Sequence, residues 1–320
     1  MPLDADRYKA MRYQHPEYIP VSVGILPAVW MKYRKDLDAI VARHPAVFGP
    51  MPETPRDYDA VGGTYVAGLH IDEWGCGWEN VTTGMESIVK RHSVPTRADV
   101  HKMTVPPANE YFKHGFMYLR LGDIRGFEDL MIDFAEEPPE LKMLIDIVLE
   151  HNMRTLKRVL ATQKPPDMIW FGDDLGMQKG LAMGPHKWRK WLKPCFAKIF
   201  RPCKEAGFDV YLHTDGCIWE IIPDLVDCGV DVLNPQYRAN GLENLVRTCK
   251  GKVCINLDLD RQMFPFATPA EIDEHVRTCV EALGSPEGGL WLCAEISPDI
   301  PLENVEAIAA ALEKYRGYFR

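Results

Sequence analysis

Five short apolar segments in the C-terminal half of the sequence are each followed by side chains that can bind a metal ion or move a proton. In chain order they are Asp173 and Asp174; His213 and Asp215; Asn234 and Gln236; Asn256, Asp258 and Asp260; and Cys293 and Glu295. Residues two positions apart on a strand lie on the same face of the sheet, so His213 should pair with Asp215 and Cys293 with Glu295. Two strands could therefore bring four metal-binding groups together.

These four groups are ligands that zinc accepts. A catalytic zinc site uses three protein ligands and leaves one position open. We therefore predict a zinc site formed by His213 and Cys293 together with Glu295 or Asp215. The alternative is that His213 only hydrogen-bonds to Asp215 or to nearby backbone, and that Cys293 is an inert core thiol.

A second group of chemically active residues lies in the segment 70–78, which reads His-Ile-Asp-Glu-Trp-Gly-Cys-Gly-Trp. The tryptophans Trp74 and Trp78, the small residues and the carboxylates are typical of a loop that lines a ligand pocket. The same composition also suits an apolar loop that only covers the mouth of a barrel. Both interpretations stay open from the sequence.

The segments that carry the first group alternate with helical patterns. Apolar runs at 168–171, 209–213, 230–234, 253–257 and 290–293 predict strands, and the stretches 185–205, 218–228, 242–250, 269–283 and 302–318 predict helices. Repeated strand–helix–strand units predict a parallel sheet with right-handed crossovers. No GxGxxG motif follows any of these strands, which favours a closed barrel over a dinucleotide-binding open sheet. We predict an α/β fold, one (β/α)8 barrel domain spanning 1–320, with the active site at the carboxyl ends of its strands.

The N-terminal half is less regular. Segments 18–25 and 116–121 predict strands, and 127–160 predicts helices interrupted at Pro138 and Pro139. The region 1–110 is expected to include a loop-rich elaboration of the barrel, because much of it is rich in proline, glycine and tryptophan. Four histidines show no partner pattern and are expected at the surface: His92, His151, His186 and His275.

The composition excludes several classes of protein. The chain has 320 residues, a hydrophobic fraction of 46% and a net charge of −9, so it can bury a full core and does not resemble a nucleic-acid or anionic-membrane binder. The sequence contains neither a membrane-spanning segment nor a signal-like N-terminus, which predicts a cytoplasmic protein. Its nine cysteines include no CxxC pair, and most are expected to be buried free thiols.

Several motifs together resemble the uroporphyrinogen decarboxylase superfamily. They are the segments 172–180 (Gly-Asp-Asp-Leu-Gly-Met-Gln-Lys-Gly), 212–216 (Leu-His-Thr-Asp-Gly), 229–235 and 297–305, joined upstream by 72–75 and 121–128. The resemblance covers most of the chain from about His70 and implies a (β/α)8 barrel. That superfamily contains tetrapyrrole decarboxylases and corrinoid-linked methyltransferases. The segment 27–34 lacks the arginine cluster of the decarboxylases, so the resemblance is closer to the methyltransferases.

The thiol-activating methyltransferases hold zinc with His-x-Cys and a later Cys. This chain keeps His213 but has Asp215 at the first Cys position, and it offers Cys293 and Glu295 near the second. A zinc ion with carboxylate ligands is better suited to polarising an ether oxygen than to delivering a thiolate nucleophile. The resemblance therefore implies an O-demethylase-like enzyme that moves a methyl group from a methoxy compound, often aromatic, to a corrinoid (cobalamin) carried by a partner protein.

The resemblance also implies roles for particular residues. Zinc or a protonated carboxylate would assist the leaving oxygen, with Asp174, Asp215 and Glu295 as the candidate catalytic residues. The residues expected to bind a small methylated substrate are Trp30, Trp74, Trp78, Asn234, Gln236 and Asp258. Two alternatives remain: a decarboxylase that acts on a carboxylated substrate, and a barrel that binds a ligand without turnover.

Overall fold

The computed structural model describes residues 3–320, which form two compact units. The first unit contains Leu3, 69–79 and 88–235, and the second contains 4–68, 80–87 and 236–320. The chain thus crosses between the units more than once. The assignment of 1–320 to a single barrel domain stays a prediction.

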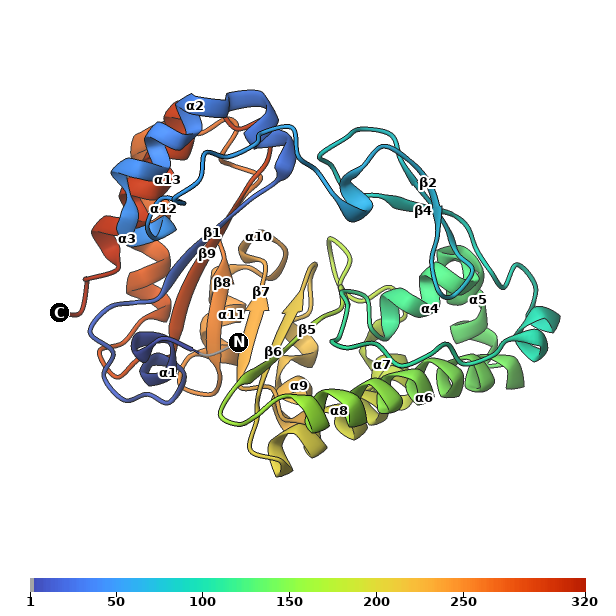
Figure 1. Ribbon diagram of the computed structural model, residues 1–320. Coiled ribbons are helices and arrows are strands. Elements are labelled where there is room, and N and C mark those ends of the chain that lie inside the picture. Colours follow the sequence, from blue (N-terminus) through green and yellow to red (C-terminus); the bar gives the residue numbers. More distant parts are fainter. Residues whose placement is uncertain (1–2) are drawn as a thin grey trace. The chain divides into compact units, whose positions relative to one another are not determined.

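The first unit contains three parallel strands in the order β5-β6-β7, with the bounds Met168–Gly172, Asp209–Thr214 and Val232–Pro235. Helix α8 (Lys193–Glu205) packs on β6, and it contacts α6 (Pro139–Thr162), α7 (Gly184–Trp191) and α9 (Ile222–Cys228) (Figure 1). The core between strand and helix is aromatic, since Phe171 of β5 packs against Phe200 of α8 with ring centroids 4.8 Å apart. Strands β6 and β7 are buried on both faces over most of their length, which explains why they are almost continuously apolar.

Two further parts complete this unit. Helices α4 (Tyr118–Arg125) and α5 (Phe127–Glu136) precede α6 in the chain, and Gly126 separates them. A small three-stranded sheet, with the order β2-β3-β4, has the bounds Gly68–Ile71, Gly77–Asn80 and Ile88–Arg91. Strands β3 and β4 pair antiparallel. A 3-10 helix, η2 (Arg97–Lys102), packs on α6.

The second unit also contains three parallel strands, in the order β8-β9-β1, with the bounds Cys254–Asp258, Leu290–Ile296 and Val21–Ile25. The α-helices of this unit are α1 (Ala5–Met11), α2 (Pro27–Arg43), α3 (Pro45–Phe48), α10 (Tyr237–Asn240), α11 (Leu242–Cys249), α12 (Pro269–Leu283) and α13 (Leu302–Tyr315). Helix α13 packs against α12, α2 and β9. A capping box sets the start of α12. The Thr268 hydroxyl accepts from the backbone N–H of Glu271, and the Glu271 carboxylate accepts from the backbone N–H of Thr268.

The predicted strand–helix succession of the C-terminal half is confirmed, and so is the α/β class. Each of the five predicted strands forms, and the predicted helix 185–205 divides at Leu192 into α7 and α8. The described residues, 3–320, form six parallel strands, three in each unit, and not the eight of a closed (β/α)8 barrel.

One expectation for the N-terminal half was wrong. Segment 116–121 is not a strand, because α4 begins at Tyr118 and the Asp173 carboxylate accepts hydrogen bonds from the backbone N–H groups of Tyr118 and Leu119. The loop-rich region also contains the 17-residue helix α2, which Pro27 begins at a position where its missing N–H has no cost.

The surface placement of two histidines was also wrong. His151 and His275 are 4% and 8% exposed, and burial lowers the pKa of His275 to about 4. All nine cysteines are free and eight are buried, as expected. None of the helices in residues 3–320 is long and apolar enough to cross a bilayer.

Candidate active site

Three residues lie side by side across the sheet of the first unit, near the carboxyl ends of its strands. The parallel register aligns Gly172 of β5 with His213 of β6, and His213 with Asn234 of β7. The Nδ1 atom of His213 lies 2.7 Å from Oδ1 of Asn234. An amide oxygen can only accept, so Nδ1 donates in this hydrogen bond, and the tautomer with its proton on Nδ1 keeps a lone pair on Nε2.

Two carboxylates and a second imidazole lie near this Nε2 atom. Nε2 of His213 lies 3.4 Å from Asp215 Oδ1 and 3.7 Å from Asp174 Oδ1. The other oxygen of Asp174 lies 3.2 Å from Nε2 of His114. One ligand atom each from His114, Asp174 and His213 lies within 4.8 Å of the other two, which makes this group a possible three-residue metal site. We call these three residues the His-Asp-His cluster.

The loops that follow β5 and β6 hold this cluster by touching at their backbones. Gly176 and Gly216 meet where the two loops cross, and a Cβ on Gly216 would lie 2.1 Å from the carbonyl oxygen of Gly176. Only glycine allows this approach, and Gly216 also has a φ of +84°. The crossing lets the backbone N–H of Asp215 donate to Asp174 Oδ1 at 3.1 Å and that of Gly176 donate to the Asp215 carbonyl at 3.0 Å.

His114 reaches the cluster from a loop that has no regular structure. The backbone N–H of Gly115 donates to the carbonyl of Gly172 at 2.8 Å, and the Asn152 amide donates to the carbonyl of Phe116 at 2.7 Å. Asp173 anchors the helix that follows this loop. Burial raises the pKa of Asp173 to about 7, although the two N–H groups at the start of α4 act in the opposite direction.

The charges within the cluster favour an ion pair in the metal-free protein. Burial alone would lower the pKa of His114, but the hydrogen bond and negative charge of Asp174 outweigh it, and the net shift is upward. Burial alone would raise the pKa of Asp174, and the bond to His114 reverses that shift. These two shifts favour a protonated His114 beside an ionised Asp174, so protons compete with a metal ion for His114.

Four further strand-end residues of the predicted site belong to the second unit: Gln236, Asp258, Cys293 and Glu295. Asp258, at the end of β8, pairs in register with Cys293 of β9, and Gln236 forms a bridge with Asp258. Glu295, two residues beyond Cys293, accepts a hydrogen bond from Arg261 at 2.7 Å. Their assignment to metal or substrate binding stays a prediction.

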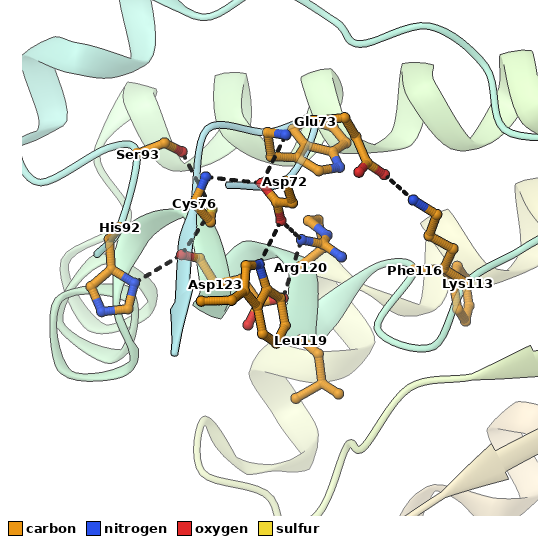
Figure 2. Close-up of polar contacts among 12 residues, drawn as sticks. Asp72, Glu73, Cys76, His92, Ser93, Lys113, Phe116, Leu119, Arg120 and Asp123 are labelled. Atoms are coloured by element: carbon orange, nitrogen blue, oxygen red, sulfur yellow. Dashed lines mark hydrogen bonds and ion pairs between the residues drawn. The ribbon is translucent and has the colours of Figure 1, made fainter. Parts of the chain in front are cut away.

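The predicted pocket loop 70–78 is organised around Asp72. Figure 2 shows this carboxylate between the backbone of Cys76 and the guanidinium of Arg120. Asp72 accepts hydrogen bonds from the backbone N–H groups of Trp74 and Cys76, the indole N–H of Trp78 and the Arg120 guanidinium, at 2.8 to 2.9 Å. With these four donors, Asp72 fixes the shape of the turn between β2 and β3.

The three predicted substrate tryptophans are each packed against a specific neighbour. Trp74 is 7% exposed and meets the His151 ring edge-on, with ring centroids 5.0 Å apart. Trp78 stacks on His70 at 6.0 Å. In the second unit, the guanidinium of Arg56 lies 3.7 Å from the centre of the Trp30 ring. Their substrate roles stay predictions.

Sequence reasoning missed His114. No strand directly precedes His114, which lies in an irregular segment. No nearby residue stands at a spacing typical of metal ligands. Its place beside Asp174 depends on the hydrogen bond between Gly115 and Gly172, which only the folded chain forms.

The model of one protein family covers the segment that starts just after His114. The family described as uroporphyrinogen decarboxylase matches residues 116–315, more than half of the chain.

The chain belongs to the uroporphyrinogen decarboxylase family. The resemblance seen in the sequence motifs is therefore confirmed. The matched segment includes β5 to β9 and two of the three residues of the His-Asp-His cluster.

One of two similar solved structures shows that this member of the uroporphyrinogen decarboxylase family shares its fold with another protein. A methyltransferase from Methanosarcina mazei is similar with a TM-score of 0.64 and 16% identity, over 97% of this chain and 98% of that one. A B12-independent methionine synthase from Shewanella sp. W3-18-1, solved with selenomethionine, has a TM-score of 0.43 and 12% identity, over 80% of this chain and 74% of that one. None of the curated proteins matches the chain.

Proposed function

We propose that this protein is a methyltransferase that moves a methyl group from a methoxy compound to the cobalt of a corrinoid carried by a partner protein. The observation that carries the proposal is the His-Asp-His cluster, whose ligand atoms lie within 4.8 Å of one another. The family membership and the shared fold with the Methanosarcina mazei methyltransferase support the same function.

The donor set of the cluster fits zinc. Catalytic zinc sites combine imidazoles and a carboxylate with an open position, and the second nitrogen of a ligating histidine is usually held by a hydrogen bond. His213 meets that second condition through Asn234. When bound, zinc would supply a positive charge that stabilises the leaving oxygen.

The proposed transfer balances in atoms and electrons. The bond between the methyl carbon and the donor oxygen breaks, and the oxygen keeps its electron pair. The partner's cobalt, in its Co(I) state, supplies the pair for the new bond to the methyl carbon and is oxidised to Co(III). The oxygen takes up one proton, for which Asp215, 3.4 Å from His213 Nε2, is the proposed carrier.

The experiment has two parts. Metal analysis of the purified protein should find about one zinc per chain. The protein should then methylate free Co(I) cobalamin from a methoxy donor, and His114→Ala and His213→Ala should each lower this rate by about 100-fold or more. His186→Ala changes an exposed histidine on α7 and should leave the rate unchanged.

Other outcomes would favour the alternatives. Release of CO₂ from a carboxylated substrate without metal or corrinoid would replace the proposal with a decarboxylase. Binding of a small molecule without turnover would indicate a ligand-binding protein. The variants Cys293→Ser and Glu295→Gln test the predicted roles of these two residues: each should lose zinc if its side chain is a ligand.

A further inference from the structure

One tryptophan of the first unit is exposed in the middle of a parallel strand. Trp170 of β5 is 43% exposed, whereas its neighbours Ile169 and Phe171 are 3% and 0% exposed. Tryptophan carries a large apolar surface, and leaving it in water within a sheet has a cost in free energy. An exposed indole of this kind offers a flat apolar surface on which a ligand can stack.

The indole of Trp170 lies next to the metal-binding histidines. Its ring is nearly parallel to that of His213, at 14° and 6.5 Å, and its centroid lies 6.3 Å from that of His114. It also stacks on Tyr211, its register partner on β6, at 6.4 Å and 21°. Trp170 and the two histidines therefore form one continuous aromatic surface.

Gly172 makes this arrangement possible. A Cβ at Gly172 would lie 2.6 Å from Cη2 of Trp170 and 3.2 Å from Nδ1 of His114. The six-membered part of the indole therefore leans over Gly172 toward the cluster. A flat ring placed on the exposed indole would hold a substituent beside His114 and His213.

We propose that Trp170 is the platform on which the methyl donor stacks, and that the donor is therefore an aromatic methyl ether. This inference rests on the proposed function. It adds a specificity-determining residue, Trp170, and a structural reason for the aromatic donor that the family resemblance implies. Trp170 suits this role better than Trp74 or Trp78, because Trp74 is buried and Trp78 is bound to Asp72 and stacked on His70.

The test compares two probes that differ only in aromaticity, 2-methoxyphenol and its saturated analogue 2-methoxycyclohexanol. Calorimetry on the zinc-loaded protein should show that wild type binds 2-methoxyphenol about 10-fold more tightly, which is the size of one aromatic stacking interaction. Trp170→Leu should abolish this preference, and Trp170→Phe should keep part of it. Trp191→Leu, a half-buried tryptophan on α7, is the matched control and should keep it in full.

The outcomes separate this inference from the proposed function. Equal affinity for the two probes, no binding of either, or an unchanged preference in Trp170→Leu would each overturn the role of Trp170. Methyl transfer to Co(I) cobalamin at equal rates from both ethers would overturn it too, and would leave the proposed function intact. Preferential binding of 2-methoxyphenol without any methyl transfer would uphold the platform and refute the methyltransferase.

Discussion

The hydrogen bond between His213 Nδ1 and Asn234 Oδ1, 2.7 Å long, assigns the proton of the imidazole and leaves Nε2 as the ligand atom. Two adjacent strands supply the pair, because the β6–β7 register places these residues directly opposite each other. Loss of this bond would free the ring to rotate and to change its tautomer.

We expect Asn234→Ala to weaken zinc binding by about 10- to 100-fold, which is the usual effect of removing the partner of a ligating histidine. Asn234→Asp keeps an acceptor oxygen and should bind zinc at least as well as wild type. Competition with a chromogenic chelator measures both. Asn244→Ala, a change on helix α11, is the control, and an unaltered affinity in Asn234→Ala would contradict the tautomer argument.

Zinc should stabilise the folded protein. A ligand that binds only the folded state adds about 2.7 kcal/mol to the free energy of unfolding at 100 times its Kd. We expect this increase in urea unfolding with zinc compared with a chelator, and we expect His114→Ala to lack most of it. If zinc raised the free energy of unfolding equally in His114→Ala and in the control His186→Ala, His114 would not be a zinc ligand.

The crossing of two loops at Gly176 and Gly216 should be intolerant of any side chain. Gly216→Ala places a methyl group 2.1 Å from a carbonyl oxygen at a positive φ, so it should lower the free energy of unfolding by about 3 kcal/mol or more. Gly122→Ala, within α4 with no atom near its Cβ, should instead raise it by about 0.5–1 kcal/mol. Thermal unfolding of both variants checks the contrast, and similar effects would refute the close approach.

The carboxyl group of Asp123 should make stability depend on pH. Burial raises its pKa from 3.8 to about 6, while the nearby Arg120 acts against this shift. As the pH rises, the Asp123 carboxyl group therefore loses its proton in the unfolded chain before it does so in the folded protein. This difference lowers the free energy of unfolding progressively between about pH 4 and 6, and the full loss applies above that range.

Asp123→Asn should relieve this penalty. The variant should match wild type near pH 4 and be more stable by about 1–3 kcal/mol at pH 8, since one pKa unit corresponds to about 1.4 kcal/mol. Urea unfolding at the two pH values measures the difference, with the exposed Asp129→Asn as control. A wild type that is as stable as the variant at pH 8 would be inconsistent with a penalised carboxylate.

The sequence by itself determined the succession of strands and helices from Met168 onward. Apolar runs bounded by glycine and proline follow local rules of periodicity, and those rules also placed Asp174, His213 and Asp215 at strand ends. The sequence motifs also contain Gly176 and Gly216, but the close backbone contact that requires glycine there is known only from the structure.

Only the tertiary structure decided the membership of the metal site. His114 joins Asp174, 60 positions away, and His213, which is farther still along the chain, through loop contacts that no local pattern encodes. The same holds for α4. Its apolar sequence suggested a strand, but the carboxylate of Asp173, just after β5, accepts hydrogen bonds from the first backbone N–H groups of this helix. The exposure of Trp170 likewise depends on the space over Gly172, which exists only once β5 and the His114 loop have come together.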